Sequence, residues 1–172
     1  LRCRCQGRGI LFGNGGDGFV IARAAAKDGW NVTALLAEGE PKTTDAITNF
    51  GRLHSLPVNI CADCTVLETQ HFDVVVDALY GTGFHGALRP SGLAACGLMN
   101  RLHKSGAFVL AVDLPSGINT DTGEVAEGAT HADLTVTFDS YKHLHVVESS
   151  APLCGKIVCS DIGIRDEWHP EF

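Results

Sequence analysis

The chain has 172 residues, 45% of them hydrophobic, and a formal net charge of −7. This length suits one domain, 1–172, with a single substantial core. The acidic balance argues against a nucleic-acid partner, because affinity for that backbone depends on clustered lysine and arginine. The sequence shows no apolar stretch near the ~18 residues that span a bilayer, and its start lacks the long apolar core of a secretory signal. We therefore expect a cytoplasmic protein that binds neither nucleic acid nor membrane.

The seven cysteines are an odd number, and disulfide frameworks are typical of smaller secreted domains, so reduced thiols are expected. Cys3-Arg4-Cys5 and Cys61-Ala62-Asp63-Cys64 together offer four sulfurs to a zinc ion. Neither pair has the usual ligand spacing, which makes free thiols the favoured interpretation.

Short apolar runs alternate with helical segments along the chain. Strands are predicted at 9–12, 31–36, 58–61, 72–77, 107–113, 132–138 and 156–162, and helices at 19–26, 45–56 and 93–104. Continuous apolar runs separated by helices are typical of a parallel sheet covered on both faces. The right-handed crossover rule then predicts an α/β protein, a three-layer α/β/α sandwich around a Rossmann-like, doubly wound and mostly parallel sheet.

The first predicted strand runs into a glycine-rich loop, Gly13-Asn14-Gly15-Gly16-Asp17-Gly18. Its glycines allow a ligand to approach the backbone, and the following helix offers N–H groups and the positive end of its dipole, a combination that favours phosphate. The oxygens of Asn14 and Asp17 also suit a hard cation or a ribose hydroxyl. An ordinary strand-to-helix turn would use the same glycines, so this loop alone leaves both interpretations open.

Two more predicted strands end in polar, glycine-bearing loops. One is Asp77-Ala78-Leu79-Tyr80-Gly81-Thr82-Gly83-Phe84-His85-Gly86, and the other begins Asp113-Leu114-Pro115-Ser116-Gly117-Ile118-Asn119. In a doubly wound sheet the ligand lies beyond the carboxyl ends of the strands. One acidic residue at such a place is often a cap or turn residue, but three such loops at one edge indicate a binding site.

These loops, together with Ala132-Asp133-Leu134-Thr135-Val136-Thr137-Phe138, resemble the NAD(P)H-hydrate epimerase family, the YjeF N-terminal domain. The resemblance runs from about Gly9 to Ile164. It implies a Rossmann-like fold and an isomerase of nicotinamide nucleotide repair, which interconverts the R and S forms of hydrated NADH and NADPH. It also implies two partners, a fused or separate NAD(P)H-hydrate dehydratase and a second copy of the chain in a homodimer.

The resemblance further implies the site residues. It places the ligands of a potassium ion on Asn14, Asp77 and Ser116, an all-oxygen set that suits a hard cation. Asp113 is the expected acid and base, and Lys142 is a second catalytic candidate that could contact phosphate or stabilise developing charge. The implied substrate contacts are Asp113 and two loop segments: Gly13, Asn14, Gly15, Gly16 and Asp17, then Gly81, Thr82, Gly83, Phe84, His85, Gly86 and Ala87.

Plainer interpretations exist for several of these residues. Asp113 could simply cap a turn, and a lone loop lysine such as Lys142 is usually solvated. His143 and His145 lie near Lys142 in the sequence, but the eight histidines have no metal-ligand spacing, and we expect most of them at the surface.

The sequence departs from the family at its start. The family's first loop has two asparagines before Gly-Gly-Asp, whereas Gly13 stands in place of the first, and the residues before the first predicted strand do not resemble the family's N-terminal helical segment. The loss of that side chain should remove one contact and loosen the loop.

Two other functions remain as alternatives. A generic NAD(P)-binding redox module is disfavoured, because Gly-x-Gly-x-x-Gly is lacking and Leu35-Leu36-Ala37, not an acidic residue, ends the second predicted strand, with Glu38 after it. A non-catalytic nucleotide- or protein-binding relative of the same fold is the stronger alternative. The enzyme is favoured over it because a scaffold has no need of the polar set Asn14, Asp17, Asp77, Asp113 and Ser116.

Overall fold

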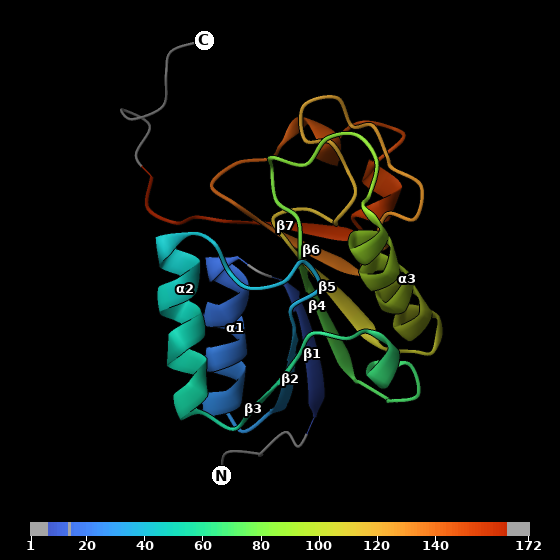
Figure 1. Ribbon diagram of the computed structural model, residues 1–172. Helices are drawn as coiled ribbons and strands as arrows, with labels where there is room; N and C mark the ends of the chain where they lie inside the picture. The colour runs from blue at the N-terminus through green and yellow to red at the C-terminus, as the bar shows by residue number, and fades with distance from the viewer. Residues whose placement is uncertain (1–6, 14, 165–172) are drawn as a thin grey trace.

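A seven-stranded sheet forms the centre of the molecule (Figure 1). The computed structural model describes residues 7–13 and 15–164. The strands are β1 Arg8–Gly13, β2 Asn31–Leu35, β3 Val58–Cys61, β4 Val74–Ala78, β5 Phe108–Val112, β6 Leu134–Phe138 and β7 Lys156–Ser160. They lie in the order β3-β2-β1-β4-β5-β6-β7, and every neighbouring pair is parallel.

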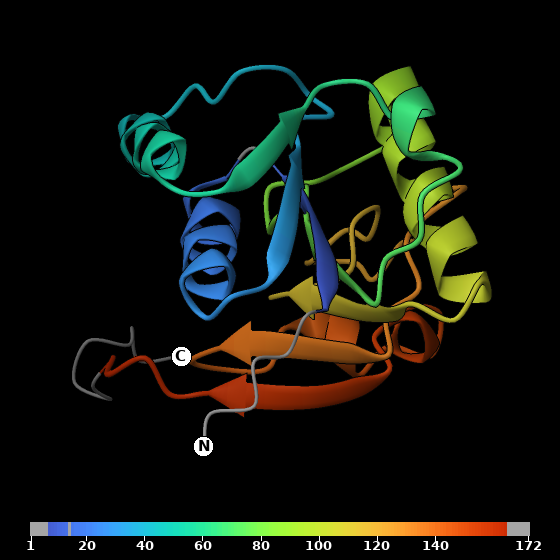
Figure 2. The ribbon, with the colours of Figure 1, turned by 90° about the horizontal axis from the view of Figure 1, so that it is seen from below.

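Helices cover both faces of this sheet. α1 Gly16–Lys27 and α2 Thr44–Gly51 pack on one face, and α3 Pro90–Lys104 packs on the other, as both ribbon views show (Figures 1 and 2). Four short 3-10 helices lie in the connections, at Arg52–Ser55, Thr65–Leu67, His143–His145 and Ala151–Leu153. The predicted three-layer α/β/α sandwich is therefore confirmed, with a sheet that is parallel throughout.

The core has two main parts because side chains alternate across a strand. In β1, Ile10 and Phe12 pack against α3 residues such as Met99, whereas Leu11 packs with Phe19 of α1 on the opposite face. All five side chains are almost completely buried. The continuous apolar run in the sequence reflects this burial on both faces.

Element boundaries differ from the prediction at the helices. The segment predicted as one helix over 45–56 leaves the α-helical conformation after Gly51 and continues as the 3-10 helix Arg52–Ser55. Glycine is a poor helix former, which accounts for a change of helix type there. α3 begins at Pro90 rather than at residue 93, because proline suits the first helical position, where its missing N–H costs nothing.

The chain direction across the sheet reverses between β1 and β4. β1 leads into α1 on one face, whereas β4 leads into α3 on the other, so the loops after these two adjacent strands diverge. Such a switch point opens a crevice at the carboxyl edge, where ligands bind in doubly wound sheets. Residues from all three loops predicted as a binding site line a cavity in this crevice.

Some further expectations concern the whole chain. The five cysteines in the described part are free thiols: Cys61, Cys64, Cys96, Cys154 and Cys159. Cys3 and Cys5, the other two candidates for zinc, lie outside the described residues. Within those residues, groups of three or more His, Cys, Asp or Glu that could bind a metal do not occur. The described helices are too short or too polar to cross a membrane.

Candidate functional site

A buried carboxylate lies at the end of β4. Asp77 and Ser116 are both fully buried. Asp77 Oδ2 accepts a hydrogen bond from the Ser116 main-chain N–H at 2.7 Å, and Oδ1 accepts one from the Ser116 hydroxyl at 2.5 Å. The Ser116 hydroxyl in turn accepts the Tyr80 N–H at 3.0 Å. These bonds join the end of β4 to the loop after β5.

The Asp77 carboxylate has no oppositely charged partner in the described part of the chain. Burial raises the pKa of Asp77, although hydrogen bonds from Ser116 act in the opposite direction. Among the described residues, no lysine, arginine or histidine forms an ion pair with it. The buried Thr130 hydroxyl has no hydrogen-bond partner, yet it lies close enough to lower the pKa of Asp77.

The side chains that meet here, Asp77 and Ser116, offer oxygen atoms alone, and such a donor set fits a hard cation and not a soft metal. Asp77 and Ser116 are adjacent, as the sequence predicts for two of the potassium ligands. Asn14, the third predicted ligand, lies outside the described residues.

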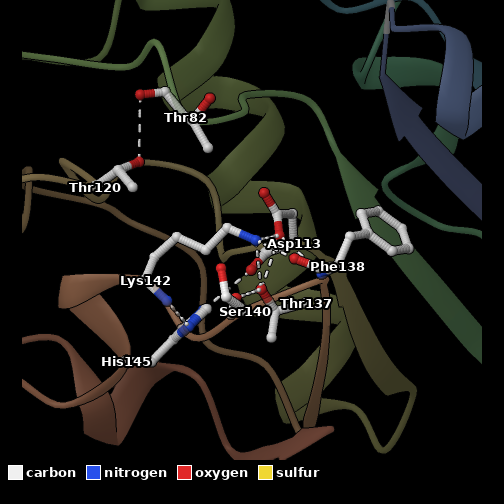
Figure 3. Close-up of polar contacts among 8 residues, drawn as sticks. All are labelled: Thr82, Asp113, Thr120, Thr137, Phe138, Ser140, Lys142 and His145. Carbon is white, nitrogen blue, oxygen red and sulfur yellow. Dashed lines mark hydrogen bonds and ion pairs between the residues drawn. The ribbon is translucent and has the colours of Figure 1, made fainter. Parts of the chain in front are cut away.

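A second polar centre joins the ends of β5 and β6 (Figure 3). Asp113 Oδ1 accepts hydrogen bonds from Lys142 Nζ at 2.5 Å, Thr137 Oγ1 at 2.8 Å and the Phe138 N–H at 3.2 Å. Lys142 Nζ also donates to Thr137 Oγ1 at 2.8 Å and to the Phe138 carbonyl at 2.7 Å. Lys142 is therefore a half-buried, fully engaged lysine, and the solvated interpretation of it is wrong.

Asp113 is held as a carboxylate. Its burial disfavours the charge, but hydrogen bonds from Lys142, Thr137 and the Phe138 N–H outweigh burial and lower the pKa of Asp113. The backbone at Asp113 has φ 69°, in the left-handed region that aspartate and asparagine tolerate better than most side chains. Such backbone strain is typical of functional positions.

His145 forms hydrogen bonds to the main chain of both Asp113 and Lys142. Its Nδ1 accepts the Lys142 main-chain N–H at 3.0 Å, so Nε2 carries the proton and donates to the Asp113 carbonyl at 3.0 Å. The ring is 4% exposed, and burial lowers the pKa of His145. The expectation of a surface position is wrong for this histidine, although His143 and His85 are exposed. A histidine three residues after Lys142 is too common a pattern to have indicated this role.

Two adjoining cavities open at the switch point. One, of about 250 Å³, is lined by Gly15, Asp17, Gly18, Ala78, Leu79, Tyr80, Gly81, Thr82, Val112, Asp113 and Phe138. The other, of about 400 Å³, is lined by Leu79, Tyr80, Gly81, Gly83, Phe84, His85, Ala87 and Arg89. We call them the Asp113 cavity and the Arg89 cavity. Both cavities are lined by Leu79, Tyr80 and Gly81, so they adjoin along this segment.

The predicted substrate residues divide between these cavities. Gly15, Asp17, Gly81, Thr82 and Asp113 line the Asp113 cavity, and Gly81, Gly83, Phe84, His85 and Ala87 line the Arg89 cavity. Gly13, Gly16, Gly86 and Lys142 are near but line neither. Lys142 thus reaches the Asp113 cavity through the Asp113 carboxylate.

The glycine-rich loop after β4 is tied to the loop after β5. The Thr120 hydroxyl donates to the Thr82 carbonyl at 3.2 Å (Figure 3). The loop after β1 leads into the N-terminus of α1. Gly15 is the N-cap residue and makes no side-chain capping hydrogen bond, so the main-chain N–H groups of the first turn are available to bind a ligand.

The glycine at position 13 has a steric reason. Gly13 pairs with Ala78 across β1 and β4. A Cβ atom at position 13 would collide with the Ala78 carbonyl oxygen and lie 3.0 Å from its carbonyl carbon. The departure from the family's asparagine therefore accompanies a close approach of β1 and β4.

The chain matches the family described as "YjeF-related protein N-terminus" over residues 4–144. It is 40% identical over 173 residues to the bifunctional NAD(P)H-hydrate repair enzyme Nnr of Methanothermobacter thermautotrophicus, covering 92% of this chain and 32% of that protein. It is 35% identical over 158 residues to the NAD(P)H-hydrate epimerase of Nitrosopumilus maritimus, covering 90% of this chain and 71% of that protein.

The fold is similar to the crystal structure of yeast ynu0, YNL200c, with a TM-score of 0.70 and 19% identity over 87% of this chain and 68% of that one. The chain spans about a third of the length of the bifunctional relatives. The sequence has four motifs of the family in the expected order, and three of them lie at one edge of the sheet. Together with the match over residues 4–144, this shows that the chain belongs to the YjeF-related N-terminal family.

Proposed function

We propose that the chain is an NAD(P)H-hydrate epimerase, an isomerase that interconverts the R and S forms of hydrated NADH and NADPH. The observation that carries the proposal is the Asp113 carboxylate, which faces a cavity at the switch point and contacts Lys142 Nζ at 2.5 Å. The name of the Nitrosopumilus maritimus relative, of which the chain covers 71%, supports the same activity.

The chemistry needs one group that gives a proton and takes one back. Lys142 Nζ gives a proton to the Asp113 carboxylate, and Asp113 then passes it to the ring hydroxyl. The C–O bond breaks, the protonated hydroxyl leaves as water, and the ring nitrogen's electron pair forms a C=N bond. Water then adds to the other face and gives a proton to Asp113, which returns it to Lys142. The protein gains or loses no proton over the whole reaction. The 2.5 Å contact between Lys142 Nζ and Asp113 Oδ1 would carry the proton transfer.

The substrate would place its hydrated ring in the Asp113 cavity. Asp17 of the same cavity lies at the start of α1, where the helix dipole favours anionic groups of the ligand. The rest of the dinucleotide would continue along Leu79 to Gly81 into the Arg89 cavity.

A potassium ion would be the cofactor, bound by Asp77, Ser116 and Asn14. The buried Asp77 carboxylate, without an oppositely charged partner within the described residues 7–13 and 15–164, supports this assignment. When bound, the ion supplies positive charge beneath the loops that contact the substrate. Asp77 and Ser116 join those loops through the Tyr80 N–H, which donates to the Ser116 hydroxyl.

The partners follow from the same activity. The bifunctional relatives contain further sequence beyond the part that this chain matches, because the match covers 32% of the Methanothermobacter thermautotrophicus protein. The proposed partner is a fused or separate NAD(P)H-hydrate dehydratase that consumes the epimerised product. We also propose that the chain forms a homodimer and is cytoplasmic.

The test is an assay of R and S interconversion. Purified chain is mixed near neutral pH with hydrated NADH enriched in one epimer, and both epimers are followed by proton NMR or chromatography against a no-protein control. Interconversion well above the control supports the epimerase. A rate equal to the control, with the nucleotide still bound, would instead support the non-catalytic relative.

A further inference from the structure

A polar network centred on Glu38 joins two residues that line the Arg89 cavity, Tyr80 and Arg89. Glu38 Oε1 accepts hydrogen bonds from the Tyr80 hydroxyl at 2.8 Å and the Ser91 hydroxyl at 2.5 Å. Glu38 Oε2 lies 3.3 Å from Arg89 Nη1. The Glu38 side chain is 16% exposed, whereas that of Arg89 is 74% exposed. Glu38 is thus shielded by its partners, whereas Arg89 and Ser91 are exposed, and Arg89 is the charged member of the network that meets solvent.

The aromatic wall of the cavity is fixed by the same network. Tyr80 packs against Phe84 with ring centroids 5.2 Å apart. A Cβ atom at Gly92 would collide with the Tyr80 hydroxyl, so this glycine allows the ring to lie against the start of α3. Because Glu38, Ser91 and Gly92 hold Tyr80 in place, the cavity is preformed before a ligand arrives.

The charge within the cavity is one-sided. Among the described residues that line it, Arg89 is the sole lysine or arginine, and none is Asp or Glu. Glu38 contacts one nitrogen of the Arg89 guanidinium, Nη1. The other N–H groups of this planar guanidinium can therefore donate hydrogen bonds to an acceptor in the cavity. Arginine forks match the oxygens of phosphate especially well.

We propose that Arg89 binds a phosphate group of the dinucleotide in the Arg89 cavity. This proposal rests on the proposed function, because it assumes that the substrate extends from the Asp113 cavity past Leu79 to Gly81. Two phosphates of the substrate class have this chemistry. The pyrophosphate is common to hydrated NADH and NADPH, and the 2′-phosphate is present in hydrated NADPH alone.

The experiment compares Arg89→Gln with Arg101→Gln. Arg101 is a matched control, since it is exposed and paired with Glu68 at 3.0 Å and lines neither cavity. KM and kcat are measured for each hydrated nucleotide, and dissociation constants are measured by calorimetry. We expect Arg89→Gln to raise KM and Kd by about tenfold with little change in kcat, as for one exposed charge-assisted hydrogen bond. Arg101→Gln should behave like the parent chain.

The two nucleotides separate the phosphates. Equal weakening of both identifies the pyrophosphate, and weakening confined to hydrated NADPH identifies the 2′-phosphate. Arg89→Lys, which keeps a point charge, should recover part of the affinity and guards against a folding defect in Arg89→Gln. The affinity of the parent chain should also weaken with salt more steeply than that of Arg89→Gln.

Unchanged KM and Kd for both nucleotides in Arg89→Gln would overturn the proposal. The calorimetric arm keeps the two claims separate. If the parent chain binds hydrated nucleotide but never epimerises it, the proposed function fails, and the effect of Arg89→Gln on Kd still decides whether Arg89 binds phosphate.

Discussion

The ring of His145 donates from Nε2 to the main-chain carbonyl of Asp113 across 3.0 Å. The same ring accepts the Lys142 N–H at Nδ1, so one neutral imidazole fixes the backbones of both members of the proposed proton path. A protonated ring has no acceptor at Nδ1, and the Lys142 N–H would lose its partner. The arrangement therefore depends on a neutral histidine.

His145 should make the stability of the fold depend on pH. Burial lowers its pKa below the ordinary 6.5, so the unfolded chain binds this proton at a higher pH than the folded chain. The free energy of unfolding should then fall as the pH drops from about 6.5 through the folded-state pKa. Denaturant titrations of His145→Gln should show a shallower slope in this window than the parent chain. His85→Gln, at an exposed position, is the control, and a slope in His145→Gln equal to that of the parent would contradict the assignment.

Asp113→Asn should separate catalysis from folding. Asparagine tolerates the left-handed backbone at this position, φ 69°, and can still accept hydrogen bonds from Thr137 and Phe138. It cannot carry the proton, so epimerisation should fall by at least about a hundredfold while nucleotide binding persists. The rate near neutral pH and the melting temperature are measured together. The exposed Asp121→Asn is the control, and a near-native rate in Asp113→Asn would move the proton path to Asp17 or Lys142.

Potassium should stabilise the folded chain through Asp77. Melting temperatures in potassium and in a bulky organic cation, at matched ionic strength, should differ for the parent chain and converge for Asp77→Ala and Asp77→Asn. Burial raises the pKa of Asp77, so without a cation the free energy of unfolding falls as pH rises from its ordinary value of 3.8 through the folded-state pKa. Potassium competes with the proton for the carboxylate. Its stabilising effect should therefore grow with pH, and a melting temperature that ignores potassium at every pH would exclude the site.

Gly13→Ala should destabilise the sheet. The new Cβ atom would collide with the Ala78 carbonyl oxygen, and backbone atoms of β4 cannot move aside cheaply. We expect the free energy of unfolding to fall by roughly 1–3 kcal/mol, the usual cost of overpacking. Gly97→Ala in α3 is the matched control, because the nearest atom is Arg101 Nη1 at 3.7 Å and alanine favours a helix by about 0.5–1 kcal/mol. Equal stability of the two variants in denaturant titrations would show that β1 and β4 separate easily.

The order of strands and helices, and the edge of the sheet at which the site lies, follow from the sequence alone. Apolar periodicity is a local property of the sequence. The apolar run of β1 predicts a strand, and the glycine-rich loop that follows it predicts where the strand ends. Helix boundaries were less well predicted. The change of helix type after Gly51 depends on how that segment packs as well as on propensity.

The contacts that make the site were decided by the tertiary structure. Asp113 and Lys142 are 29 positions apart, and Glu38 and Ser91 are 53 apart, so their pairing depends on which loops the sheet brings to one edge. The sequence predicted Asp77, Ser116 and Asp113 as site residues because each lies in a loop motif that resembles the family. His145 and Arg89 lie in no such motif, and their roles arise from burial and from neighbours that only the folded chain supplies, because charge and hydrogen bonding act through space and not along the sequence.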